Sequence, residues 1–283
     1  MQDELLWRYT LAQQIAARAH APSSVAAMFL EGSVAQRYAD RFSDIDLAIV
    51  WTRTPTAQER RDIVARARGY ARDAVLSRQT APADWAGPLT RDDVALDVRH
   101  TTVQATEQLL VAVLELADLH LARQQRMAAL TTALPLMNPA LITQWQQQAA
   151  AYPFALSVAM VQRHLRFRPA WEHETLAERN DALALYGSFC AAQKHLLLVL
   201  LGINGLYYPG WRWIDHVLNE MRVTPPNLAA RLKQLFAIVS IDPLASVYQL
   251  HELIDETFAL VETHLPAVDT SRARARFQSR RMP

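Results

Sequence analysis

The stretch LEGSVAQRYADRFSDIDLAIV, residues 30–50, decides the fold of the first part of the chain. From Asp44 onward it alternates polar and apolar residues and then becomes wholly apolar, which is typical of a strand with one face in a protein core. The apolar run VAAMFL, residues 25–30, lies just ahead of Gly32 and indicates a strand that leads into a tight turn. A third strand is predicted over residues 94–103, VALDVRHTTV, which also alternates.

Two aspartates one residue apart, Asp44 and Asp46, begin the second of these strands. Residues i and i+2 of a strand project to the same face, so the two carboxylates lie together while Ile45 and Leu47 face the core. Like charges at this spacing repel unless a cation neutralises them, and Mg²⁺ prefers carboxylate oxygens. The pair therefore predicts a magnesium site.

A third carboxylate, Asp97, interrupts the strand over residues 94–103. If this strand lies beside the one that carries the aspartate pair, the three carboxylates converge and can hold two Mg²⁺ ions about 4 Å apart. The alternative is that Asp97 pairs with a nearby arginine such as Arg99 at a strand edge. Asp92 and Asp93 are rivals for the same role, although they precede the strand in a loop-like setting.

Gly32 and Ser33 follow the first strand where the chain turns into a short helix. A glycine lets the backbone approach a phosphate, amides at a helix N-terminus favour anions, and Ser33 adds a hydroxyl donor. A phosphate-binding turn opposite a metal site is the arrangement needed to transfer a nucleotidyl group from a nucleoside triphosphate to a hydroxyl.

Composition limits the class of protein. The 283 residues include only seven glycines, which favours helix, and 51% are apolar, which is enough for packed cores and excludes disorder as the main state. With 29 basic and 28 acidic residues, no global field attracts extended nucleic acid or an anionic membrane. The single cysteine, Cys190, excludes an internal disulfide framework and suits a reducing compartment, and no secretory signal or membrane-length apolar run is visible. We expect a soluble cytoplasmic protein.

Helical periodicity dominates the rest of the chain. It predicts helices over residues 5–19 and 56–77, and after residue 103 only helical segments broken by prolines, with no further strand. The predicted fold class is therefore α+β, with a small mixed-sheet domain followed by an all-α helical bundle. We expect the first domain to span residues 1–119 and the second residues 120–268. Residues 269–283 form a basic tail that we expect to be frayed.

The spacing of the polar residues resembles the signature of the DNA polymerase β-like nucleotidyltransferase superfamily: Gly32-Ser33, ten intervening residues, Asp44-Ile45-Asp46, then Asp97. A small catalytic domain followed by a helical domain is similar to bacterial antibiotic nucleotidyltransferases, notably the streptomycin and spectinomycin adenylyltransferases. The resemblance implies that Asp44 and Asp46 bind both metals, that Asp97 binds one and acts as general base, and that Gly32 and Ser33 contact the β- and γ-phosphates of ATP. Streptomycin-type enzymes carry glutamate in place of Asp97, so the acceptor stays open.

Two basic residues of the helical part are candidates for contact with ATP. Arg212 lies in Tyr208-Pro209-Gly210-Trp211-Arg212-Trp213, which resembles the family segment that places a basic residue near the triphosphate. Lys194 lies in a long apolar helix, where a buried position would require a partner such as a phosphate. The alternatives are that Arg212 stacks between tryptophans and that Lys194 extends into solvent.

An acidic group early in the helical part is a candidate for binding a cationic acceptor such as an aminoglycoside. Its members are Glu172, Glu174, Glu178 and Asp181. The alternative is a solvated helix start, which the helix dipole favours.

The expected function is Mg²⁺-dependent transfer of AMP from ATP to a hydroxyl of a small molecule, an antibiotic being one such acceptor. ATP is expected because the resembling family uses it. Two alternatives stay open: nucleotidylation of a protein or an RNA end, and a regulator that binds nucleotide without turnover. The sequence indicates neither the acceptor nor the oligomeric state.

Overall fold

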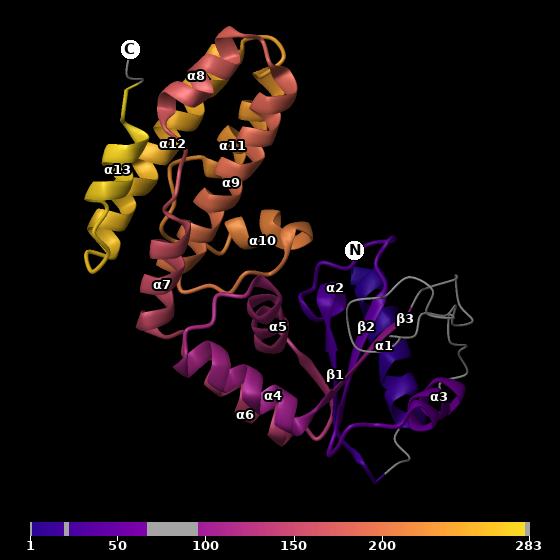
Figure 1. The fold of residues 1–283 in the computed structure, drawn as a ribbon. Coiled ribbons are helices and arrows are strands. Elements are labelled where there is room, and N and C mark those ends of the chain that lie inside the picture. Colours follow the sequence, from indigo (N-terminus) through magenta and orange to yellow (C-terminus); the bar gives the residue numbers. More distant parts are fainter. Residues whose placement is uncertain (1, 20–22, 67–95, 281–283) are drawn as a thin grey trace. The chain divides into compact units, whose positions relative to one another are not determined.

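The computed structural model describes residues 2–19, 23–66 and 96–280. The chain forms two compact units (Figure 1), one of residues 1–115 and 126–151, the other of residues 116–125 and 152–283. The rival carboxylates Asp92 and Asp93, and residues 67–77 of the expected second helix, lie outside the described residues.

The first unit combines four strands with helices, which confirms the α+β class. Its strands are β1 (Val25–Glu31), β2 (Ile45–Trp51), β3 (Leu96–Thr102) and β4 (Leu134–Met137). Its helices are α1 (Gln2–Ala19), α2 (Gly32–Ala35), α3 (Ala57–Arg66), α4 (Val103–Leu110), a π-helical turn (Val111–Glu115), α6 (Pro139–Ala150), and the end of α5 (Leu121–Thr131), which begins in the second unit.

The sheet has the strand order β3-β2-β1-β4 and is mixed, as predicted. Strands β1 and β2 are antiparallel, β2 and β3 are parallel, and β4 is antiparallel to β1. One face of β2 packs into the core through Ile45 and Leu47, together with Ile15 of α1. The opposite face of β2 carries Asp46 at its start and is apolar and buried farther along, at Ala48 and Val50.

Strand β4 corrects the expectation that no strand follows residue 103. It has only four residues, all half-buried, and pairs with β1 through Leu134, Pro135 and Met137. Proline lacks a backbone N–H and is tolerated on an edge strand, where β4 lies. A proline in so short a segment indicates a break in the sequence, so only the pairing with β1 reveals the strand.

The second unit is helical (Figure 1). It contains α7 (Phe154–His164), α8 (Ala170–Glu178), α9 (Ala182–Asn204), a 3₁₀ turn (Trp211–Trp213), α10 (Ile214–Leu218), α11 (Leu228–Ile238), α12 (Pro243–His264) and α13 (Ser271–Phe277). Helix α9 is its centre: it contacts α7, α8 and α12, and its residues 196–201 are fully buried. A Cβ on Gly202 would lie 3.0 Å from Cβ of Met160, so glycine allows α7 and α9 to pack closely.

Helix α9 is also the one described helix that is long and apolar enough to cross a bilayer by length and composition. Half of its most apolar 18-residue window is buried inside the protein, and its mean hydropathy there is 1.4. A core helix satisfies the same criteria, and the contacts of α9 are those of a core helix.

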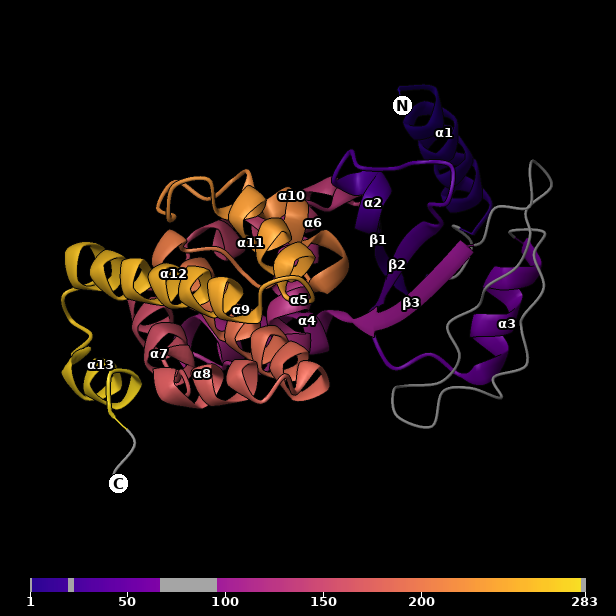
Figure 2. The same cartoon turned by 90° about the horizontal axis from the view of Figure 1, so that it is seen from above.

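Part of the basic tail is a packed helix, so the expected fraying is wrong for residues 271–277. Phe277 of α13 is 1% exposed and its ring contacts those of Phe167 and Phe258. Arg274 forms an ion pair with Glu262 of α12 at 2.9 Å, and α13 lies beside α12 in Figure 2. One aromatic anchor and one paired arginine hold the helix in place.

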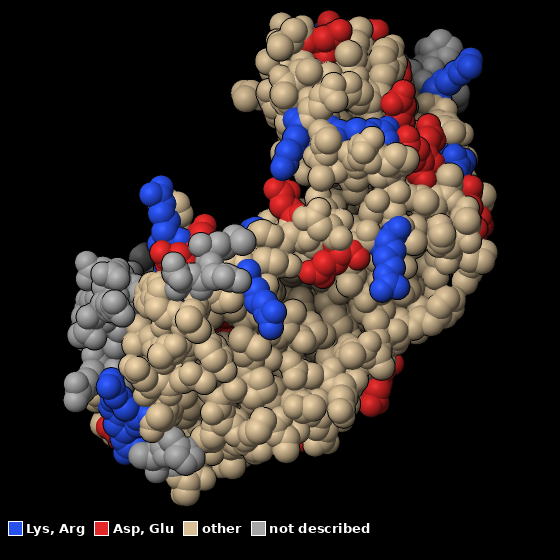
Figure 3. Space-filling model, turned by 180° about the vertical axis from the view of Figure 1, so that it is seen from behind, with Lys and Arg blue, Asp and Glu red and all other residues tan. Residues whose placement is uncertain are grey.

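Charged side chains are dispersed over the face of the molecule that Figure 3 draws. Figure 3 shows separate basic and acidic groups on a surface that is mostly uncharged. This distribution agrees with the near balance of 29 basic and 28 acidic residues.

Candidate functional site

Three aspartates gather on the polar face of the sheet, as the sequence predicted. Asp46 and Asp97 are each the second residue of a strand, and the parallel register of β2 and β3 pairs them directly. Asp44 immediately precedes β2. One carboxylate oxygen from each of the three residues lies within 4.8 Å of the others. Their strand neighbours Ile45 and Leu96 are fully buried, which fixes the direction of the carboxylates.

The donor set suits a divalent cation, and the cluster could bind metal ions. Mg²⁺ takes oxygen ligands at about 2.1 Å, so the outermost ligand oxygens around one ion lie about 4 Å apart. The 4.8 Å envelope of the three carboxylates is close to this requirement, and each of the residues is accessible to solvent. Small side-chain rotations suffice to bring three oxygens onto one ion.

Gly32 is required where the turn after β1 passes this cluster. Its φ of +69° lies in the left-handed region, and a Cβ at this position would collide with the carboxylate of Asp46, lying 3.2 Å even from Cβ of that residue. The backbone at Gly32 therefore packs directly against a metal-ligand candidate. Any larger residue would displace the carboxylate or the turn.

Ser33 presents an unsatisfied hydroxyl on the same turn. The residue is 1% exposed, and its Oγ has no hydrogen-bond partner within the described part of the chain. Buried hydroxyls are normally paired, so an orphaned one next to a backbone cradle is consistent with a site that a ligand oxygen completes. The assignment of Gly32 and Ser33 to phosphate binding stays a prediction.

A fourth carboxylate, Glu31, lies in the same row of the sheet and has no role in the sequence-based prediction. It pairs in register with Asp46, which in turn pairs with Asp97, so the three side chains share one face. Arg99 donates two hydrogen bonds of 2.7 Å to the two carboxylate oxygens of Glu31. Arg126 adds an ion pair at 3.5 Å.

The environment of Glu31 keeps it ionised. Its burial, at 8% exposure, favours the neutral acid and would raise its pKa. The attraction and hydrogen bonds of Arg99, together with the charge of Arg126, outweigh burial and hold the pKa of Glu31 below its usual value. One carboxylate of the row is thus neutralised by arginines. The sequence-based prediction missed Glu31; the signal that could have found it is a charged residue at the end of an otherwise apolar strand.

The basic residues predicted to contact ATP lie in the second unit. Arg212 is exposed in the 3₁₀ turn Trp211–Trp213, and Lys194 is exposed on α9. Their assignment to the triphosphate stays a prediction.

The acidic group lies on α8 and at the start of α9, and most of its members have local partners. Glu172 contacts Arg168 at 3.4 Å, and Glu174 lies 3.9 Å from Nδ1 of His251. Asp181 caps α9 by accepting a hydrogen bond of 3.2 Å from the backbone N–H of Ala184. Glu178 ends α8 and is exposed. Binding of a cationic acceptor by this group stays a prediction.

Comparison with known proteins gives three results. Residues 120–214 match a domain of unknown function, DUF4037, a region that excludes the aspartate cluster. No curated protein matches the sequence. The crystal structure of a nucleotidyltransferase-like protein from Exiguobacterium sibiricum is similar, with 10% sequence identity, a TM-score of 0.37, and coverage of 95% of this chain and 76% of that one. The function must therefore be argued from the geometry of the site.

Proposed function

We propose that the protein is a Mg²⁺-dependent nucleotidyltransferase that moves AMP from ATP to a hydroxyl of a small molecule. The observation that carries the proposal is the gathering of Asp44, Asp46 and Asp97 within 4.8 Å on one face of the sheet. The glycine-serine turn packed against Asp46 supports it, because this turn offers a close backbone approach and an unpaired hydroxyl.

The three aspartates would hold Mg²⁺. When bound, the ions would polarise the reacting oxygens and balance the negative charge of the triphosphate. Glu31, in the same row, instead accepts hydrogen bonds from Arg99 and lies near Arg126.

We assign each step of the transfer to particular residues of the chain. Asp97 takes the proton of the acceptor hydroxyl as that oxygen bonds to the α-phosphorus of ATP, and the bond from the α-phosphorus to the bridging oxygen breaks. Pyrophosphate leaves with the electron pair of that bond. The hydroxyl of Ser33 donates a hydrogen bond to an oxygen of the departing pyrophosphate, and Gly32 lets the backbone approach the same phosphate. Arg212 and Lys194 are proposed to contact the triphosphate, and the acidic group of α8 and α9 a cationic acceptor.

Pyrophosphate release tests the proposal. The chain is incubated with ATP, Mg²⁺ and panels of aminoglycosides and lincosamides, and intact mass detects an added AMP on the acceptor. Asp46→Asn should abolish release and also weaken Mn²⁺ binding measured by electron paramagnetic resonance. Asp62→Asn is the matched control, because Asp62 lies on α3, where it accepts a hydrogen bond from Gln58. Full activity of Asp46→Asn would contradict the metal role.

The same assay separates the alternatives. AMP found on a protein side chain or an RNA end would replace the small-molecule acceptor. ATP binding without pyrophosphate release, across all acceptors, would indicate a nucleotide-binding regulator and overturn the transferase proposal.

A further inference from the structure

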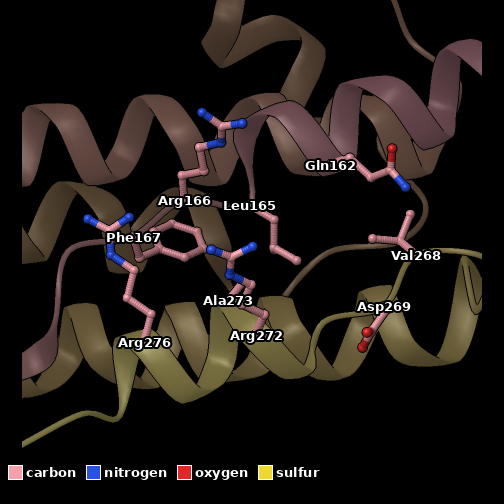
Figure 4. A pocket seen from close by; sticks show the side chains of 9 residues that line it. All are labelled: Gln162, Leu165, Arg166, Phe167, Val268, Asp269, Arg272, Ala273 and Arg276. Carbon is pink, nitrogen blue, oxygen red and sulfur yellow. The ribbon is translucent and has the colours of Figure 1, made fainter.

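A ligand-sized pocket lies within the helical unit. It has a volume of about 370 Å³ (Figure 4). The end of α7 and the segment after it line one side, and α13 with the loop before it lines the other. Its apolar wall consists of Leu165, Phe167 and Val268, which are 3–4% exposed. This volume lies in the range of about 300–1,000 Å³ that is typical of small-molecule sites.

Three arginines from two separate elements line this cavity. Arg166 comes from the segment after α7, and Arg272 and Arg276 lie four residues apart on α13, on one face of the helix. Figure 4 shows both arginines of α13 projecting toward the segment that carries Phe167. No side-chain hydrogen bond or ion pair joins any of the three to another residue of the described part of the chain. All three side chains are exposed, so solvent screens their mutual repulsion, and a bound anion would reduce it further.

The neighbouring arginine of the same helix shows the contrast. Arg274 donates a hydrogen bond of 2.9 Å to Glu262, lies 3.5 Å from Asp255 and stacks over the ring of Phe258 at 4.9 Å. The arginine that holds α13 in place is therefore neutralised, whereas the two that face the cavity are not. Asp269 is the one acidic residue among the described residues that line the cavity, so three arginines and one aspartate leave a net charge of +2.

We propose that this cavity binds an organic phosphate: a small molecule with at least two negative charges and an apolar or aromatic body, such as a nucleoside diphosphate. The planar guanidinium forks of the arginines match phosphate oxygens in pairs. The exposed edges of Leu165, Phe167 and Val268 would contact the body of the ligand. The site shares no residue with the aspartate cluster, so this inference does not depend on the proposed nucleotidyl transfer.

Calorimetric titration of the full chain tests the proposal, with ADP as the probe, inorganic pyrophosphate as the comparison that lacks an organic body, and no divalent cation present. Without a cation the aspartate cluster repels phosphate, so heat reports on the cavity. We expect Arg272→Gln/Arg276→Gln to weaken binding by about tenfold or more, because two charge-assisted contacts are lost. The control Arg222→Gln/Arg280→Gln removes the same charge at exposed positions outside the cavity and should change the affinity less than about twofold. If the first double variant does not fold, Arg166→Gln alone should weaken binding several-fold.

Four outcomes would overturn the proposal. The first is that ADP does not bind with a dissociation constant below about 1 mM. The second is that both double variants lose affinity equally, which would indicate general charge attraction. The third is that inorganic pyrophosphate binds as tightly as ADP. The fourth is that the variants at the cavity change the binding of anionic phosphatidylglycerol vesicles or of an RNA oligonucleotide but not the binding of ADP. An organic body that adds affinity, lost specifically with the arginines of α13, would support it.

Discussion

The substitution Glu31→Gln tests whether the arginine-paired carboxylate stabilises the sheet beneath the aspartate cluster. It preserves the size of the side chain and removes its charge. Glu31 is 8% exposed and accepts two hydrogen bonds of 2.7 Å from Arg99. Removing one partner of a buried pair costs about 3–5 kcal/mol, and because glutamine keeps one acceptor oxygen we expect the lower end, about 3 kcal/mol. That loss lowers the folding equilibrium constant roughly a hundredfold.

Urea denaturation at pH 7, followed by circular dichroism, measures this loss. Hydrogen exchange at β1, β2 and β3 assigns it to the first unit, because the chain has two units that can unfold separately. The comparison set is Glu31→Gln, Arg99→Met and the double variant, which together give the coupling energy of the pair. The double variant should be more stable than the sum of the single losses implies.

The effect of Glu31→Gln should depend on pH in a defined direction. Arginine pairing lowers the pKa of Glu31 below the value of 4.5 that the side chain has when unfolded. The unfolded chain therefore binds the proton first, and the stabilisation by Glu31 is fully present above about pH 4.5 and is lost as the pH falls through its lower folded pKa. A loss below about 1 kcal/mol at pH 7, additive single variants, or a difference that persists in acid would refute the reasoning.

Substitutions at four further positions test other parts of the structure. Gly32→Ala forces a Cβ into the carboxylate of Asp46 and should weaken Mn²⁺ binding, measured by electron paramagnetic resonance. Gly187 lies on a helix with open space around it, so Gly187→Ala should raise the free energy of unfolding by about 1 kcal/mol, measured by urea denaturation. Asp181→Ala removes a helix cap and should cost about 1 kcal/mol, while asparagine should restore it, as judged by thermal denaturation. Burial lowers the pKa of His100 to about 4, and its neutral ring accepts a hydrogen bond of 3.1 Å from Trp51. Between pH 6.5 and 4 only the unfolded chain takes up this proton, so the free energy of unfolding falls as the pH falls. His100→Gln should reduce this pH dependence, measured by urea denaturation at several pH values.

Local patterns predicted what local geometry controls. The alternation around Asp44 and Asp46 determines which side chains share a face, and the apolar flanks of Asp97 determine the direction of the third carboxylate. Their meeting requires only that β2 and β3 be neighbours. The parallel register that pairs Asp46 with Asp97 supplies this condition.

Features that depend on distant partners could not be predicted in the same way. Glu31 and Arg99 are 68 residues apart in the chain, and no periodicity links them. Strand β4 exists only through its pairing with β1. Helix α13 has one apolar anchor, Phe277, in a run of arginines, and only the aromatic contacts of that ring show that the segment is packed.

The balance of charge on the sheet connects the predicted and unpredicted parts of the site. Four carboxylates lie on one face, and the protein supplies two hydrogen bonds from Arg99 and the nearby charge of Arg126 to one of them, Glu31. Glu31 is therefore a poor metal ligand, because a cation there would compete with two guanidinium groups already in place. The remaining three carboxylates lie within 4.8 Å of one another, at a spacing where mutual repulsion is strong. A divalent cation held by these three carboxylates would reduce that repulsion, whereas at Glu31 the two guanidinium groups already do so.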